Sequence, residues 1–220
     1  FSIIGLSNFF YLFSKKDYFD TVFDDPLAHT WSLGVEEQFY LIFPIFFILV
    51  FINFKKLNNI FYFLSFLIIT GIIVTFIFQS NTKLTFYSPI FRFWEFLIGT
   101  LTFLISTRLK FKSNLISPLT LLGLLFLILL VKELNATTLI LISTISSAIF
   151  ILLFENNKKG IFNLIIENKF FVYFGNISYS FYLWHLPIIY FYDLYFVESF
   201  FRIPSILLIT ICLSIFSYIY

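Results

Sequence analysis

Seven long runs of apolar residues restrict the fold of this chain more than any other feature. A helix that crosses a membrane needs about 20 mostly apolar residues, and each run is close to that length. Within the runs apolar and polar residues do not alternate, which argues against a transmembrane β-barrel. A helix satisfies its backbone hydrogen bonds within one segment, as lipid requires. The runs cover approximately residues 35–54, 60–79, 89–106, 115–131, 137–154, 170–192 and 203–220.

The composition supports a membrane protein. Hydrophobic residues make up 60% of the chain and charged residues 12%, whereas a soluble domain carries roughly twice that charged fraction. The net charge of +2 gives no reason to expect nucleic acid. A single cysteine, Cys212, excludes a disulfide framework and a cysteine-based metal site. We predict an all-α, polytopic membrane helical bundle, with about seven spanning helices and a partial N-terminal helix at residues 1–13.

The chain begins at Phe1 and ends at Tyr220, inside apolar stretches at both ends. We interpret it as one membrane domain over residues 1–220 that is truncated at both ends. We therefore expect this fragment to be inactive without the rest of its protein.

The stretch HTWSLGVEEQFYLIFP, residues 29–44, places a histidine and two glutamates at the start of an apolar run. Charge next to lipid is costly, so these residues need an explanation. In one interpretation Glu36 and Glu37 occupy the first turn of a helix, where the helix dipole stabilises carboxylates. In the other they face inward, toward other polar groups. The first interpretation leaves His29 and Gln38 without a role.

A second polar stretch is SPIFRFWEFLIGTL, residues 88–101. Arg92 and Glu95 are three residues apart, so they share a helix face and can pair. Glu95 lies about 10 Å along the predicted helix, and an uncompensated charge near the bilayer centre costs about 3 kcal/mol or more. A self-neutralising structural pair and a pair that lines a polar cavity both stay open. Gly99 is predicted to let a neighbouring helix approach closely.

The third polar stretch is NISYSFYLWHLPI, residues 176–188. Ser178, Tyr182 and His185 recur at helical spacing, so one helix stripe carries a hydroxyl, a phenol and an imidazole. Pro187 lacks a backbone N–H and is predicted to kink the helix beside His185. His185 either makes one interhelical hydrogen bond or shares a polar site with its two neighbours on the stripe.

The membrane orientation links the three stretches. Lysine and arginine divide between alternate loops, eight on one side and five on the other, and the side with more of them should face the cytoplasm. The loop with His29 is then outside. In either orientation, helices 35–54 and 89–106 begin at the membrane surface where helix 170–192 ends. We therefore predict that the three stretches surround one polar cavity.

Imidazole, carboxylate and guanidinium groups suit two kinds of chemistry. They can act as acids and bases and bind an anionic group, or relay protons in a proton-coupled transporter. The sequence contains no phosphate-binding glycine loop and no HExxH motif, and we predict no metal site. These residues alone do not separate an enzyme from a transporter.

Taken together, the three stretches resemble the acyltransferase 3 family of multispanning membrane acyltransferases. Residues 29–44 match the family signature nearly throughout, and LSNFFYLF with YFD, residues 6–13 and 18–20, resembles the segment before it. RFWEFLIGTL at 92–101 resembles the second motif, and ISYSFYLWHLPI at 177–188 resembles the third. The motifs follow the family order over almost the whole chain.

The resemblance implies an integral membrane acyltransferase in the multi-pass architecture of the bacterial inner membrane. It would move an acyl group, commonly acetyl, from acyl-CoA to a hydroxyl of a surface glycan or glycoside, with no bound cofactor. The family's first helix typically carries an arginine and a histidine favoured as the catalytic residue, so we expect that histidine upstream of this sequence.

Within this sequence, the resemblance implies that Glu36, Glu37 and His29 take part in catalysis. Glu36 and Glu37, with Arg92 and Glu95, would shape and charge the cavity. The residues expected to bind substrates or support the cavity wall are Trp31, Ser32, Gln38, Tyr40, Arg92, Glu95, Ser178, Tyr182 and His185.

Two other functions stay open. A proton-coupled transporter or flippase of a polar or lipid-linked substrate would move its solute without an acylated product, and it predicts inverted repeats. We find no such repeat in the sequence. A structural subunit, in which the three stretches only pack, predicts polar faces that point at separate neighbours.

Overall fold

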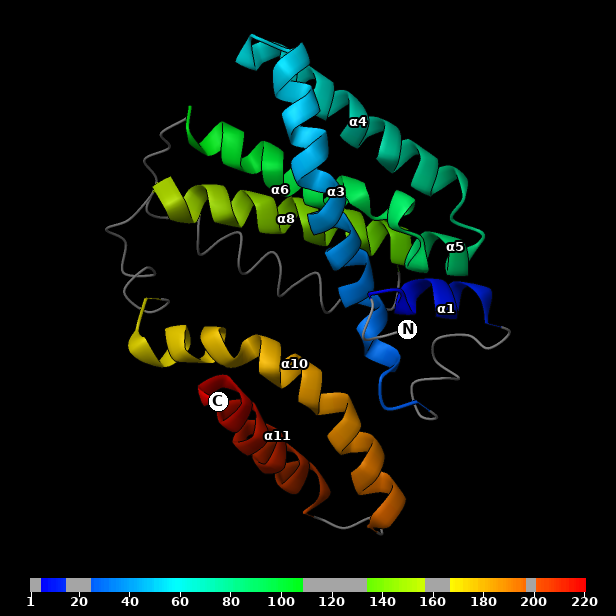
Figure 1. Cartoon of the computed structure of the whole chain (residues 1–220), viewed down its shortest axis with the longest axis vertical. Helices are drawn as coiled ribbons and strands as arrows, with labels where there is room; N and C mark the ends of the chain where they lie inside the picture. The colour runs from blue at the N-terminus through cyan, green and yellow to red at the C-terminus, as the bar shows by residue number, and fades with distance from the viewer. Residues whose placement is uncertain (1–4, 15–24, 109–133, 157–166, 197–200) are drawn as a thin grey trace. The chain divides into compact units, whose positions relative to one another are not determined.

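The computed structural model describes residues 5–14, 25–108, 134–156, 167–196 and 201–220. Every regular element in these ranges is a helix, which confirms the predicted all-α fold (Figure 1). The elements are α1 (Ser7–Phe13), the 3-10 turn η2 (Ala28–Thr30), α3 (Trp31–Asn53), α4 (Leu57–Ile77), α5 (Thr82–Tyr87), the 3-10 turn η3 (Pro89–Phe91), α6 (Phe93–Ser106), α8 (Ala136–Asn156), α10 (Lys169–Tyr195) and α11 (Arg202–Ile219).

Within the described residues, three helices are long and apolar enough to cross a membrane. They are Ala28–Asn53, which joins η2 to α3, Leu57–Ile77 and Arg202–Ile219. Phe93–Ser106 and Ala136–Leu152 are shorter apolar helices. These features fit the predicted helical membrane bundle.

Six of the seven predicted segments correspond to helices, and the remaining one, residues 115–131, lies outside the described residues. Two helix starts differ from the prediction near the polar stretches. α3 begins at Trp31 and not at residue 35. The segment predicted as one helix from residue 89 is a 3-10 turn followed by α6, because the backbone of Arg92 (φ −113°, ψ −20°) interrupts the regular helix. The prediction also lacks α5, whose six residues are too few for a periodic pattern.

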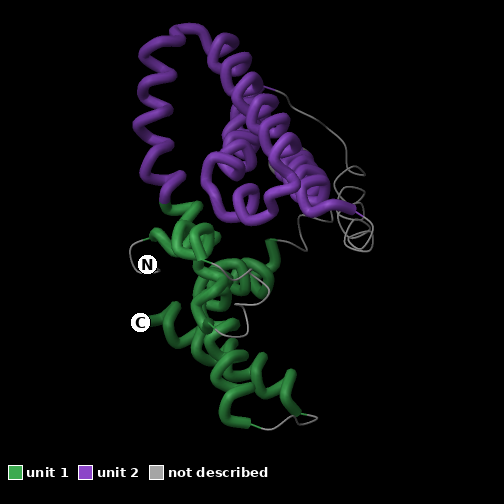
Figure 2. Tube along the Cα trace, turned by 90° about the vertical axis from the view of Figure 1, so that its right-hand side faces the viewer, with its two compact units in different colours: residues 1–37, 166–220 green, residues 38–165 purple. Residues whose placement is uncertain are grey.

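The chain divides into two compact units, which are coloured separately in Figure 2. Unit 1 consists of Phe1–Glu37 and Ile166–Tyr220, and unit 2 consists of Gln38–Ile165. α3 therefore begins in unit 1 and continues into unit 2. Each unit is described by itself below.

In unit 1, α10 and α11 lie side by side along the chain's C-terminal part (Figure 1). Ile206, Thr210 and Ser214 recur every four residues on α11 and are buried. The two hydroxyls donate to carbonyls one turn earlier in the same helix, at 2.7 and 2.6 Å, so their burial leaves no polar atom unsatisfied. The indole of Trp184 adds a hydrogen bond of 3.2 Å from α10 to the hydroxyl of Ser217.

An ion pair joins the two helices where they approach their connection. The guanidinium of Arg202 donates two hydrogen bonds of 2.7 and 2.6 Å to the carboxylate of Asp193. Asp193 lies just beyond the spanning segment predicted for this helix, residues 170–192. The hydrogen bonds from Arg202 lower the pKa of the exposed Asp193 carboxyl below its usual value.

Unit 2 is held together by an aromatic and aliphatic core. The ring of Phe39 stacks on Phe96 with centroids 4.5 Å apart and on Phe43 at 4.9 Å. Stacked aromatic pairs add to the stabilisation that comes from burial of apolar area. The buried members of this core are Phe39, Val50, Ile60, Leu64, Ile68, Leu97 and Leu104.

The close helix approach in unit 2 occurs at a different glycine from the predicted one. A Cβ atom at Gly71 of α4 would lie 2.8 Å from the Cβ of Trp94 in α6, so only glycine fits there. A Cβ at Gly99 would meet no atom within 4 Å among the described residues. The prediction that Gly99 permits a close helix contact is therefore wrong for the described part of the chain, because Gly99 faces outward from α6.

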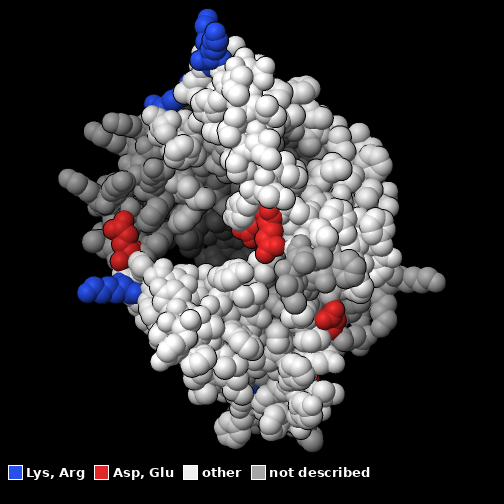
Figure 3. Space-filling model, viewed as in Figure 1, with Lys and Arg blue, Asp and Glu red and all other residues white. Residues whose placement is uncertain are grey.

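Charged side chains are sparse on the face of the described residues that Figure 3 presents. Many large apolar side chains are exposed instead, among them Leu41 of α3 and Phe66 of α4, at 75% and 63% exposure. In water such a surface would drive association, whereas lipid solvates it. The surface thus agrees with helices that lie in a membrane.

Candidate functional site

In the first polar stretch, a turn held by hydrogen bonds precedes α3. The carboxylate of Asp25 accepts a hydrogen bond of 2.9 Å from the backbone N–H of Leu27 and one of 2.5 Å from the hydroxyl of Tyr11. Backbone hydrogen bonds from Ala28 to Asp25 and from Thr30 to Leu27, at 3.1 and 3.0 Å, then form the 3-10 turn. This turn places His29 immediately before α3.

The early start of α3 decides between the two interpretations of the glutamates. Glu36 and Glu37 follow Trp31 by five and six residues, so they lie beyond the first turn, which holds no acidic residue. The interpretation that the positive end of the helix dipole stabilises them is therefore wrong, since that effect is confined to the first turn.

Glu37 instead packs against the start of the chain in unit 1. Gly5 has φ +65°, and a Cβ atom there would collide with a carboxylate oxygen of Glu37. Gly34, one turn earlier on α3, lies against the same segment, because a Cβ there would be 3.0 Å from both the side-chain oxygen of Asn8 and the carbonyl of Gly5. The two glycines let the carboxylate of Glu37 and the segment before α1 approach each other. Glu37 remains exposed, and Glu36 is half-buried.

The first and third polar stretches meet in unit 1. The hydroxyl of Tyr182, on α10, donates a hydrogen bond of 2.6 Å to the backbone carbonyl of His29. The hydroxyl of Ser32 lies 2.6 Å from the same phenol oxygen. A phenol has one O–H to donate, and Tyr182 donates it to the carbonyl of His29. Ser32 is therefore the donor in the second bond. The sequence prediction that these stretches lie together is realised for His29, Ser32 and Tyr182.

The side chain of His29 is enclosed, with an exposed fraction of 4%. Its ring lies edge-on to those of His185 and Tyr182, with centroids 4.9 and 5.0 Å apart. Within the described residues neither ring nitrogen makes a hydrogen bond. The backbone carbonyls of Leu183 and Tyr182 lie near the ring. The carbonyl of Leu183 lacks its usual helical donor, because Pro187 has no N–H.

His185 has a defined hydrogen bond of its own. Its Nδ1 lies 2.5 Å from the carbonyl of Tyr182. A carbonyl only accepts, so this contact assigns the proton to Nδ1 and, in the neutral ring, leaves Nε2 as the acceptor. Ser178, predicted on the same stripe, is exposed, and its hydroxyl donates to the carbonyl of Gly175 in its own helix at 2.7 Å. The structure brings Tyr182 and His185 to His29 and leaves Ser178 outside this group.

The remaining residues of the first stretch have mixed environments. Trp31 is buried, with an exposed fraction of 7%. Gln38 is half-buried, and Tyr40 is 59% exposed and lies edge-on to Phe39. Gln38 and Tyr40 belong to unit 2, whereas Trp31 belongs to unit 1.

The second polar stretch forms an ion pair inside unit 2. The guanidinium of Arg92 contacts Glu95 twice, with Nε 2.6 Å from Oε1 and an Nη atom 3.0 Å from Oε2. The two side chains keep 19% and 17% exposure, and the Arg92 guanidinium also lies 5.8 Å from the ring centre of Phe86. The predicted pairing is present. A polar cavity shared with His29 stays a prediction from the sequence, since the two residues lie in different units.

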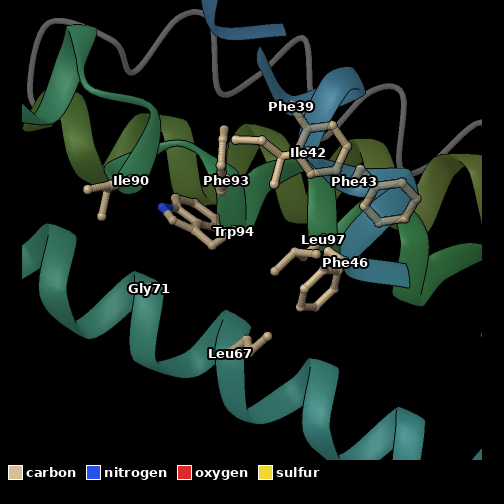
Figure 4. Close-up of a pocket in the computed structure, with 10 residues that line it drawn as sticks. All are labelled: Phe39, Ile42, Phe43, Phe46, Leu67, Gly71, Ile90, Phe93, Trp94 and Leu97. Carbon is tan, nitrogen blue, oxygen red and sulfur yellow. The ribbon is translucent and has the colours of Figure 1, made fainter. Parts of the chain in front are cut away.

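Unit 2 also contains a cavity of about 240 Å³ without titratable groups. Figure 4 shows its side chains converging from α3, α4 and α6. The indole N–H of Trp94 donates to the carbonyl of Phe91 at 2.8 Å, so it is already satisfied. This cavity cannot supply acid–base chemistry. Its lining consists of Phe39, Ile42, Phe43, Phe46, Leu67, Gly71, Ile90, Phe93, Trp94 and Leu97.

Four polar residues that support the site are absent from the predicted set. The hydroxyl of Ser7 donates to the carbonyl of Thr30 at 2.8 Å, and Tyr11 binds Asp25 as described above. Ser7 and Asn8 are fully buried. Their signal in the sequence is two adjacent polar residues inside an otherwise apolar stretch. In the described ranges no group of three or more histidine, cysteine or acidic residues is placed to hold a metal ion.

Comparisons with known proteins agree with the motifs. The family model described as an acyltransferase domain matches residues 1–219. The chain is 30% identical over 215 residues to O-acetyltransferase OatA of Staphylococcus aureus strain NCTC 8325 / PS 47. The aligned region covers 90% of this chain and 35% of that protein. The OatA of strain COL shows the same values. The chain thus spans about a third of the length of these relatives, and no solved structure matches it.

Proposed function

Since the chain belongs to the acyltransferase 3 family, we propose that its full-length protein is a membrane enzyme that transfers an acyl group to a hydroxyl. We further propose an acetyl group, acyl-CoA as the donor, and a surface glycan or glycoside as the acceptor. The relatives named as O-acetyltransferases support acetyl transfer to oxygen. The apolar helices support a location in a membrane, for which we propose the bacterial inner membrane.

The meeting of His29 with α10 is the observation that best supports an enzymatic site. Tyr182 follows His29 by 153 residues, and yet its hydroxyl binds the carbonyl of that turn. Buried polar groups are costly in a membrane unless they have partners or a function. An enclosed imidazole without a hydrogen bond in the described residues, beside a second imidazole, fits a group that binds a reacting hydroxyl.

The proposed reaction is direct acyl transfer. The acceptor oxygen attacks the thioester carbonyl carbon, the new C–O bond forms, the C–S bond breaks, and coenzyme A leaves as a thiol. A base takes the proton of the attacking hydroxyl. We propose that His29, Glu36 and Glu37 serve this proton transfer together with a histidine upstream of this sequence, and that positive charge stabilises the oxyanion.

The other predicted site residues have proposed binding roles. Arg92 would attract an anionic part of the donor, because a guanidinium binds such groups through several hydrogen bonds. Glu95 would hold Arg92 in place through their ion pair. Trp31, Gln38, Tyr40 and Ser178 stay proposals for substrate binding.

Glu37 gives the sharpest test of the proposal. We expect Glu37→Gln in the full-length protein to reduce glycan acylation by about a hundredfold or more, the usual contribution of a group that transfers protons. Membrane insertion should stay intact. The change keeps the size of the side chain, and its matched control is Glu167→Gln, at an exposed glutamate of unit 1.

The readout is mass spectrometry of the acceptor glycan from cells with equal amounts of membrane-inserted protein. Full acylation by the Glu37 variant would remove Glu37 from the mechanism. A wild-type protein that moves a solute and yields no acylated product would refute the enzyme proposal.

A further inference from the structure

We infer that Tyr182 is a positioning residue, which holds the turn at His29 so that the imidazole is presented to the substrate. The kinetic part of this inference rests on the proposed acyl transfer. The structural part, that Tyr182 fixes the His29 turn, can be tested without any activity.

Two hydrogen bonds of Tyr182 reach the turn through groups other than the imidazole nitrogens. Its phenol donates to the carbonyl of His29 and accepts from Ser32, both at 2.6 Å. The Ser32 hydroxyl also lies 3.3 Å from the His29 carbonyl, so the three groups form a closed set. Loss of the phenol oxygen would leave Ser32 only the longer of its two contacts.

Hydrogen bonds that do not involve the imidazole also hold the other end of the turn. The hydroxyl of Ser7 donates to the carbonyl of Thr30 at 2.8 Å, and the hydroxyl of Thr30 donates to the carbonyl of Leu27, also at 2.8 Å. These bonds fix the backbone around His29 without using its ring. The imidazole is thereby oriented while its nitrogens make no hydrogen bond among the described residues.

A neutral imidazole carries one N–H and one lone pair. The carbonyls of Leu183 and Tyr182 both lie near the ring. That of Tyr182 already accepts from His185, so the carbonyl of Leu183 is the natural acceptor for the N–H. The lone pair has no donor in the described part of the chain. A substrate hydroxyl would supply that donor, which would also remove the cost of about 1–3 kcal/mol for a buried polar atom without a partner.

Tyr182 could also act only through packing, since its ring lies 5.0 Å from that of His29 and 5.4 Å from that of His185. Tyr182→Phe separates the two roles, because phenylalanine keeps the ring and removes only the hydroxyl. Ser32→Ala is a second, milder variant that keeps the bond from Tyr182 to the His29 carbonyl. Tyr195→Phe, at a 73% exposed position of the same helix, is the matched control.

The experiment uses full-length protein in detergent and measures two quantities. The first is kcat and KM for acetyl transfer from acetyl-CoA. The second is the rate at which diethylpyrocarbonate modifies His29 relative to His185, determined by mass spectrometry of the same molecules. His29 is enclosed and His185 is half-buried, so the wild-type ratio should be low.

We expect Tyr182→Phe to lower kcat by about tenfold or more with little change in KM, and to raise the modification ratio by about tenfold, the effect of losing one to two hydrogen bonds. Ser32→Ala should shift both quantities less, and Tyr195→Phe should match the wild type. Wild-type kcat and ratio in Tyr182→Phe, or equal effects of Tyr195→Phe, would overturn the inference. If the wild type transfers no acyl group, the proposed function fails, and the modification ratio alone decides whether Tyr182 holds the turn.

Discussion

The polar side chains of the two compact units find their hydrogen-bond partners in different places. In unit 1, the hydroxyls around the turn at His29 reach across to another element, as Ser7 does to Thr30 and Tyr182 does to His29. Away from that turn, Ser178, Thr210 and Ser214 bond within their own helices. In unit 2, the threonines of the helices mostly bond back to their own helix: Thr70 to Phe66, Thr100 to Phe96, Thr102 to Ile98 and Thr144 to Ile140. The ion pair of unit 2 likewise joins residues three apart.

This difference indicates in which unit the relative positions of neighbouring segments are more tightly constrained. A hydroxyl that bonds within its own helix satisfies its polar atom and requires nothing of its neighbours. A bond between separate segments requires both of them to be placed within a few tenths of an ångström. Lipid demands only that polar atoms be satisfied. The additional precision in unit 1 therefore suggests a site, whereas the aromatic core of unit 2 suggests a scaffold.

Single changes at the ion pair of unit 2 should have the largest effect on stability. We expect Arg92→Met or Glu95→Met alone to lower the free energy of unfolding by about 2 kcal/mol, between the values for surface and buried pairs. Each single change leaves one partly enclosed charge without its opposite. Thermal unfolding of the full-length protein in detergent measures the loss.

The double variant with both methionines separates the two interpretations of the pair. If the pair is only structural, the double change should recover most of the stability and the acylation, because no lone charge remains. If Arg92 binds the donor, stability should recover and acylation should not. Recovery of both would place the pair in the scaffold and confine the functional site to other residues.

Changes at Gly71 and Gly99 of unit 2 should have a smaller effect. Gly71→Ala should destabilise the protein by about 1–2 kcal/mol, because the new methyl group would lie 2.8 Å from the Cβ of Trp94. Gly99→Ala is the matched change in an open position, and it should be neutral or stabilising by about 0.5–1 kcal/mol, since alanine favours a helix. Equal unfolding temperatures for the two variants would contradict the packing described for α4 and α6.

The sequence predicted the helices of this molecule well and its polar contacts less completely. Hydrophobic runs of about 20 residues in a membrane protein have few alternatives to helices, so α3, α4, α10 and α11 could be located within a few residues. The start of α3 could not be located in this way. Asp25 and Tyr182 fix the turn before it through contacts that no local sequence pattern indicates.

The sequence also could not predict which partner each polar side chain binds. Tyr182 and Ser178 share a predicted stripe, and yet Tyr182 binds the His29 turn while Ser178 bonds within α10. The helical period gives the face of a residue but not what lies opposite that face. Gly71 and Gly99 illustrate the same limit, because either could have been the close approach until Trp94 was placed.

One enclosed polar residue from each unit gives the most direct test of where the functional site lies. Thr75, in unit 2, is 5% exposed, and its hydroxyl lies 2.8 Å from the carbonyl of Gly71 in its own helix and 3.3 Å from that of Phe91. His29, in unit 1, is 4% exposed, and its ring has no hydrogen bond among the described residues. The measurement is the rate of acetyl transfer per folded full-length enzyme for His29→Gln and Thr75→Val. We expect about a hundredfold loss for His29→Gln and a rate near that of the wild type for Thr75→Val. A wild-type rate for His29→Gln would contradict the claim that the polar residues of unit 1 form the site.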